Sequence, residues 1–88
     1  MLERLRRDID GIDKKILKLL SRRLNISKKI GEYKKMNHFP VQDKAREKKL
    51  IEDRLQRFQE LGFDDPIFVQ ELFQLIMKKS REVQSKKA

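Results

Sequence analysis

Residues 2–35, with the sequence LERLRRDIDGIDKKILKLLSRRLNISKKIGEYKK, decide the fold. Their apolar side chains recur at steps of three and four, a heptad spacing that predicts one long amphipathic helix. The seam consists of Leu2, Leu5, Ile9, Ile12, Ile16, Leu19, Ile26, Ile30 and Tyr33, widened by Leu17, Leu20 and Leu24. A helix over this range would be about 50 Å long, whereas a compact domain of this size has a radius of gyration of about 12 Å. We therefore expect a second copy of the chain as its partner.

Two shorter helices are expected after the first. Asp43 is a typical cap at the start of a second helix, and Gly62 ends that helix. Asp65 followed by Pro66 is a typical start of a third. No segment alternates apolar and polar residues as a strand would. We expect an all-α fold, one domain over residues 1–88, a frayed tail from Ser85 on, and helices at about 2–35, 43–60 and 65–84.

The composition restricts the possible functions. The 88 residues carry 23 basic and 14 acidic side chains, a net charge of +9, which favours an anionic partner such as a nucleic acid, a membrane surface or a small polyanion. No cysteine is present, and His38 is the single histidine, so we expect no disulfide and no metal site built from cysteine or histidine ligands. No apolar run is long enough to span a bilayer, and the first residues do not resemble a secretion signal. We expect a cytoplasmic protein that binds no membrane.

One charged residue interrupts the apolar seam. Arg23 follows Leu19 at the heptad spacing, where leucine would be expected, and a buried guanidinium needs a partner. That partner is either an acidic side chain, with snorkelling to solvent as a further possibility, or a ligand anion. Lys34 lies 11 positions later, which returns it to within about 20° of the same helix face. With Ser27 and Ile30 between them, these two cations suggest an anion pocket.

Two further polar groups have a structural and a functional interpretation. Asp43, Arg46 and Glu47 fall within one turn, where they would either start the second helix or line a site. Ser80 and Gln84 extend the apolar stripe of the third helix at the i, i+4 spacing, either as its solvated end or as a pocket lining. Both interpretations stay open for both groups.

Together these residues resemble the AroQ-class chorismate mutases, the all-helical group. The resemblance covers nearly the whole chain in five segments in register. The matching segments are Leu5-Arg6-Arg7-Asp8-Ile9-Asp10 with Ile12-Asp13, Leu19-Leu20-Ser21-Arg22-Arg23, Ile30-Gly31-Glu32-Tyr33-Lys34, Pro40-Val41-Gln42-Asp43-Lys44-Ala45-Arg46-Glu47, and Phe73-Gln74-Leu75-Ile76-Met77-Lys78-Lys79-Ser80 with Gln84.

The resemblance implies an intertwined homodimer that rearranges chorismate to prephenate, a step toward phenylalanine and tyrosine, without a cofactor. The substrate is a dianion, and negative charge grows on its ether oxygen as the C–O bond breaks. The implied roles are carboxylate binding by Arg23 and by Arg6 of the other subunit, hydrogen bonds to the ether oxygen from Lys34 and Gln84, capture of the ring hydroxyl by Glu47 with Asp43, supporting contacts from Arg46 and Ser80, and apolar walls from Ile30, Leu50 and Met77.

Two residues depart from the family pattern. Gln42 stands where arginine is frequent, and Arg81 stands where a small apolar residue is common. Arg81 would perturb the pocket if it pointed inward and would be harmless if it pointed outward. Two alternative functions are an isochorismate pyruvate lyase on the same scaffold and a basic helical dimer that binds nucleic acid. Basic residues spread over all three helices argue against nucleic acid, and the Asp43, Arg46 and Glu47 set favours the mutase.

Overall fold

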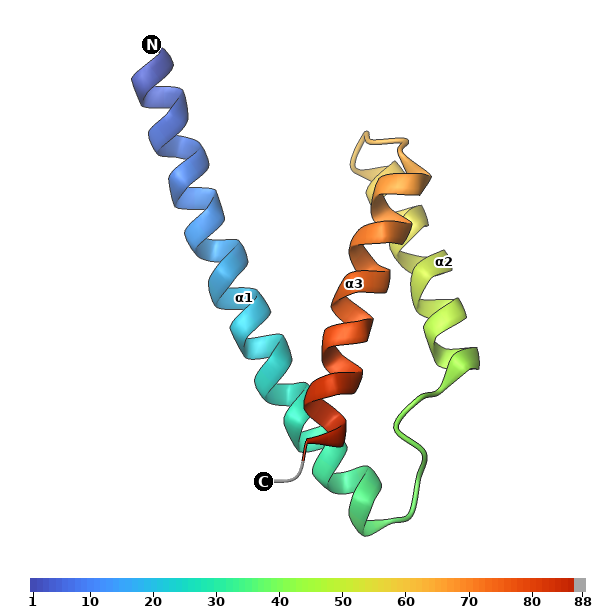
Figure 1. Ribbon diagram of the computed structural model, residues 1–88. Coiled ribbons are helices and arrows are strands. Elements are labelled where there is room, and N and C mark those ends of the chain that lie inside the picture. Colours follow the sequence, from blue (N-terminus) through green and yellow to red (C-terminus); the bar gives the residue numbers. More distant parts are fainter. Residues whose placement is uncertain (87–88) are drawn as a thin grey trace.

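The computed structural model describes residues 1–86, which form three helices and no strand (Figure 1). The helices are α1 (Leu2–Met36), α2 (Lys44–Glu60) and α3 (Pro66–Ser85). The expected all-α class with three helices is thus confirmed, and the expected helix ends differ by no more than one residue. Ser85 belongs to α3, whereas Lys87 and Ala88 of the expected frayed tail lie outside the described residues. None of these three helices combines the length and apolar content needed to cross a membrane.

The cap residues explain where α2 and α3 begin and end. The Asp43 carboxylate accepts the Arg46 backbone N–H at 3.0 Å, and the Asp65 carboxylate accepts that of Phe68 at 3.1 Å. Each bond satisfies a first-turn donor that has no partner within the helix. Gly62 follows α2 with a φ of +95°, a left-handed conformation that glycine adopts at little cost. These local signals fix the α2–α3 hairpin.

The third helix holds the fold together. α3 packs against both α1 and α2, whereas α1 and α2 make no close backbone contact within residues 1–86. In Figure 1, α2 and α3 run side by side as an antiparallel pair, and α1 meets α3 only near the C-terminal ends of both helices. A space therefore remains between α1 and α2, with α3 along one side.

Small residues allow α1 and α3 to cross closely. Ser27 and Ser80 are buried at the crossing, where the Ser27 hydroxyl donates to the Ser80 hydroxyl at 3.1 Å. One turn further along α1, a Cβ added to Gly31 would lie 2.6 Å from both Cα and the carbonyl oxygen of Gln84. No side chain fits there, so glycine sets the distance at which Gln84 passes α1.

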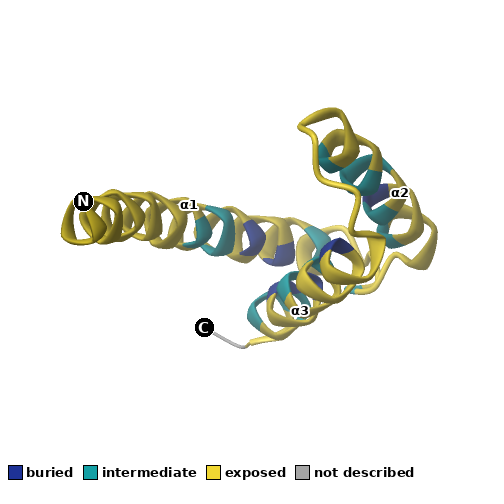
Figure 2. Cartoon of the chain, turned by 90° about the horizontal axis from the view of Figure 1, so that it is seen from above, coloured by how far each residue is buried: buried dark blue, intermediate teal, exposed yellow. Residues whose placement is uncertain are grey.

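The N-terminal half of α1 packs against no other part of residues 1–86. Residues 1–19 are all exposed (Figure 2). The six seam residues of this half are each between 48% and 59% exposed, namely Leu2, Leu5, Ile9, Ile12, Ile16 and Leu19. The chain measures 54 × 28 × 15 Å. Its accessible surface is 7963 Å², whereas a compact monomer of this mass has about 5,500 Å². A single chain therefore leaves a large apolar surface uncovered.

Gly31→Ala is expected to lower the free energy of unfolding by about 1–3 kcal/mol, because the new methyl group forces α1 and α3 apart. Urea unfolding followed by circular dichroism measures this change. Gly11→Ala is the matched control, since an added Cβ at Gly11 meets nothing within 4 Å and alanine has the higher helix propensity. Equal stability of the Gly31→Ala variant and the wild type would show that the crossing tolerates a wider spacing.

Candidate active site

A cavity of about 360 Å³ opens between α1 and α2 and is lined by residues from all three helices. This volume suits a small organic ligand. Seven of the eight site residues expected from the sequence line it, as do the three expected wall residues. The cavity lining comprises Arg23, Ile26, Ser27, Ile30, Lys34, Val41, Asp43, Arg46, Glu47, Leu50, Met77, Ser80, Arg81 and Gln84. Arg6 is the eighth expected residue, and it does not line this cavity.

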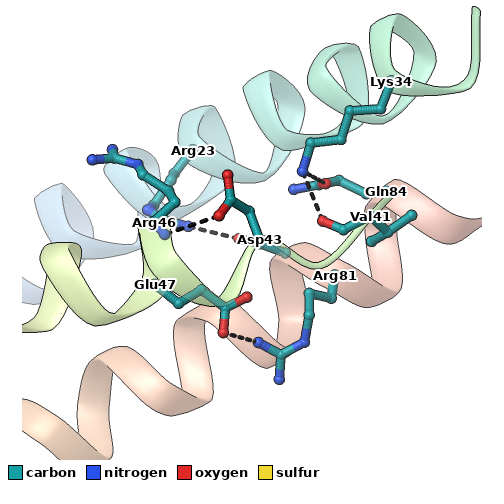
Figure 3. Close-up of polar contacts among 9 residues, drawn as sticks. Arg23, Lys34, Val41, Asp43, Arg46, Glu47, Arg81 and Gln84 are labelled. Carbon is teal, nitrogen blue, oxygen red and sulfur yellow. Dashed lines mark hydrogen bonds and ion pairs between the residues drawn. The ribbon is translucent and has the colours of Figure 1, made fainter. Parts of the chain in front are cut away.

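Lys34 and Gln84 are hydrogen-bonded to each other on one wall of the pocket (Figure 3). The Lys34 ammonium donates to the Gln84 side-chain oxygen at 2.9 Å and to the Val41 carbonyl at 2.7 Å. An ammonium has three N–H donors, so one remains for a ligand. Because Lys34 can only donate, the oxygen of Gln84 must face it, which leaves the Gln84 amide nitrogen free to donate as well. Among the described residues, the Lys34 ammonium thus keeps one spare N–H and the Gln84 amide keeps two, so both side chains can donate to a ligand on this wall.

Arg23 lies at the opposite end of the pocket wall and is half-buried. Its guanidinium donates to the Ser80 hydroxyl at 2.6 Å, and no carboxylate among residues 1–86 forms an ion pair with it. The acidic partner considered from the sequence is therefore not present in this part of the chain. Burial lowers the pKa of Arg23 below its ordinary value, and the charges of Arg54 and then Arg46 lower it further. A bound anion would relieve this repulsion.

Ser80 links the crossing to the pocket. Its oxygen accepts from both Arg23 and Ser27. The proton of Ser80 is not used in either bond, so the hydroxyl can donate to a third group. The interpretation of Ser80 as a solvated helix end is wrong, because the residue is only 7% exposed.

The start of α2 supplies the third wall. Asp43 caps the helix and also lines the pocket, so the structural and the functional interpretation hold together for this residue. Arg46 and Glu47 follow within the same turn; Asp43 and Arg46 are exposed, and Glu47 is half-buried. A single turn of helix thus brings one cation and two carboxylates to the pocket.

Two lining groups were not assigned a role from the sequence. The first is the carbonyl of Val41, a main-chain group with no signal in the side-chain pattern. The second is Arg81, whose direction the sequence left open. In the structure Arg81 lies on the pocket wall, where it donates to the Glu47 carboxylate at 2.7 Å, and it also lines a neighbouring cavity. Its position between Met77 and Gln84 at helical spacing is the signal that places it on the pocket side of α3.

The pocket suits a small anion with hydrogen-bonding groups. Its lining holds four cationic side chains and two carboxylates, among apolar walls. Within residues 1–86, no three side chains of histidine, cysteine, aspartate or glutamate are grouped to hold a metal ion. The fold and this pocket define a small all-helical protein with a site suited to a compact, negatively charged molecule.

Comparison with known proteins assigns this class to a family. The chorismate mutase type II family matches residues 5–85. The chorismate mutase of Methanocaldococcus jannaschii is 34% identical over 84 residues, which cover 94% of this chain and 83% of that protein. The bifunctional chorismate mutase/prephenate dehydratase of Escherichia coli is 37% identical over 76 residues, and the match covers 86% of this chain but 19% of that protein.

A solved structure extends the similarity to the backbone. A conserved hypothetical protein from Pyrococcus furiosus superposes with a TM-score of 0.71 and 37% identity, covering 94% of this chain and 93% of that one. The chain belongs to the chorismate mutase type II family.

Arg23→Met is expected to leave the free energy of unfolding unchanged or to raise it by about 1 kcal/mol, because methionine fills similar space without a half-buried charge that lacks an ion pair among residues 1–86. The same variant should lose affinity for chorismate, the ligand used in the titration. Urea unfolding and ligand titration measure the two effects, and Arg22→Met, on the exposed neighbour, controls for the loss of one positive charge. Strong destabilisation by Arg23→Met alone would mean that Arg23 serves the fold.

Proposed function

We propose that the pocket catalyses the rearrangement of chorismate to prephenate by binding the dianion in a compact conformer and stabilising charge on its ether oxygen. Family membership makes the chain a chorismate mutase, an isomerase of aromatic amino acid biosynthesis. The observation that carries the mechanism is the Lys34–Gln84 pair, in which both side chains keep N–H groups without a partner among the described residues.

The reaction is unimolecular, so it needs neither a nucleophile nor a proton relay. As the C–O bond breaks, negative charge develops on the ether oxygen. Donors fixed in advance toward that oxygen stabilise the transition state more than the ground state. Lys34 and Gln84 would act in this way, because their bonds to each other and to the Val41 carbonyl hold them in place before the substrate arrives.

The remaining lining residues would select the reactive conformer. Arg23 would bind one carboxylate, and Arg46 with Ser80 would support the second. Glu47, with Asp43 beside it, would accept a hydrogen bond from the ring hydroxyl. The apolar walls of Ile30, Leu50 and Met77 would keep the folded conformer compact, which lowers the entropic part of the barrier.

We further propose that two chains intertwine through α1. The surface of one chain exceeds that of a compact monomer by about 2,400 Å², an area typical of obligate dimers. The exposed seam of residues 2–19 has the heptad spacing of a helix that packs against other helices. A second copy, with its own exposed apolar side chains on α3, is the natural cover for it.

Arg6 would then belong to the neighbouring site. It lies 17 positions before Arg23 on the same unbroken helix, which corresponds to about 25 Å along the axis. Such a separation prevents both arginines of one chain from reaching one ligand in one pocket. In an intertwined dimer, Arg6 would complete the carboxylate site of the partner chain.

Lys34→Ala and Gln84→Ala are each expected to lower kcat for chorismate by about 10²–10³-fold, because each removes a donor to the transition state. The loss of absorbance of chorismate measures turnover. Lys35→Ala is the matched control, since Lys35 is the adjacent lysine and does not line the pocket. Wild-type turnover by both pocket variants would refute the mechanism. Pyruvate release from isochorismate, without chorismate turnover, would instead indicate the lyase.

Shared sites can be tested by mixing two inactive variants. Arg6→Ala and Lys34→Ala chains, refolded together, should regain roughly a quarter of wild-type activity, because half of the dimers are mixed and each mixed dimer holds one intact site. Each variant refolded alone controls for residual turnover. If Arg6 serves the pocket of its own chain, mixing restores nothing.

A further inference from the structure

The ion pair between Arg81 and Glu47 has no role in the mechanism above. Arg81 projects from α3 and Glu47 from α2, and the two side chains meet at the pocket wall (Figure 3). The guanidinium nitrogen and the carboxylate oxygen are 2.7 Å apart, and the side chains are 30% and 22% exposed. Among the four ion pairs within residues 1–86, this one alone joins two different helices. It is also the least exposed of the four, so solvent screens it less than the others.

The charge of the proposed substrate explains why Glu47 would need a cation beside it. Glu47 would receive the substrate hydroxyl, but its negative charge also faces a ligand with two carboxylates. Like charges repel strongly where burial reduces screening. A cation held against Glu47 offsets that repulsion while the carboxylate remains a hydrogen-bond acceptor.

The geometry leaves Glu47 able to bind a ligand. Arg81 occupies one carboxylate oxygen, and within residues 1–86 the second oxygen has no hydrogen bond. Glu47, Arg81 and Met77 also line a second, more open cavity of about 540 Å³ on the α3 side. The ion pair is therefore part of the wall that separates this cavity from the pocket.

We propose that Arg81 is a positioning residue that orients and neutralises Glu47, so that Glu47 binds the hydroxyl of a dianionic substrate without repelling its carboxylates. This inference rests on the proposed function of the pocket.

A double-mutant cycle on the purified full chain tests the proposal. Arg81→Met should raise KM for chorismate by about tenfold, with a smaller change in kcat, because the effect is on binding. In the Glu47→Gln background the same substitution should change KM by less than about twofold, because no charge is left to neutralise. Arg81→Lys should retain most of the wild-type affinity, since it keeps the cation.

Several outcomes would overturn the proposal. An equal rise in KM with and without Glu47→Gln would mean that Arg81 binds the substrate directly. An unchanged KM in the Arg81→Met variant would mean that the pair is only structural. Lys79→Met is the matched control, because it removes a cation and an ion pair from α3 outside the pocket. Arg81→Gln, which is less apolar, replaces Arg81→Met if that variant fails to fold.

Assays of the wild-type protein distinguish a failure of the proposed function from a failure of the role proposed for Arg81. If wild-type protein does not consume chorismate, the proposed function fails before Arg81 is considered. If wild-type protein is active and the cycle shows no coupling between Arg81 and Glu47, only the role of Arg81 is refuted.

Discussion

The close crossing of α1 over α3 is the constraint on which the rest of the structure depends. Gly31 allows the backbone of Gln84 to approach, which brings the Gln84 side chain to Lys34. One turn earlier, Ser80 meets both Ser27 and Arg23. Since α1 and α2 make no close backbone contact within the described residues, this crossing, with the Lys34 bond to Val41, positions the donors of α1 relative to the rest of the pocket. Few apolar residues of the described chain are buried, so the geometry of the pocket depends largely on this one helix crossing.

Local features of the sequence were sufficient to predict the helices and part of the site. Heptad spacing and the caps at Asp43 and Asp65 depend on neighbouring residues only, so they predict the helices well. The shared face of Arg23 and Lys34 also follows from helical geometry. The ion pair of Arg81 with Glu47, and the lack of an ion pair to Arg23 within residues 1–86, depend on how the helices pack, which local spacing does not encode. The roles assigned to the pocket residues came from resemblance rather than from periodicity.

The electrostatics of the pocket oppose stability and favour binding. Arg23 is partly buried near Arg46 and Arg54 and forms no ion pair with a carboxylate of residues 1–86, which destabilises the free protein. The same arrangement favours the binding of a dianion, because the bound anion offsets the repulsion between these arginines. Sites of this kind are a common source of the conflict between stability and activity. The basic surface, with a net charge of +9, adds long-range attraction for the same ligand.

The segment of residues 37–43 acts as a spacer between α1 and α2. Lys34 holds it through the carbonyl of Val41, and no close backbone contact between α1 and α2 in the described chain sets the width of the opening. The size of molecule that the protein accepts is therefore governed in part by the length of a connecting loop. Insertions or deletions in this loop offer evolution, or an engineer, a way to change substrate size while every charged side chain of the pocket stays in place.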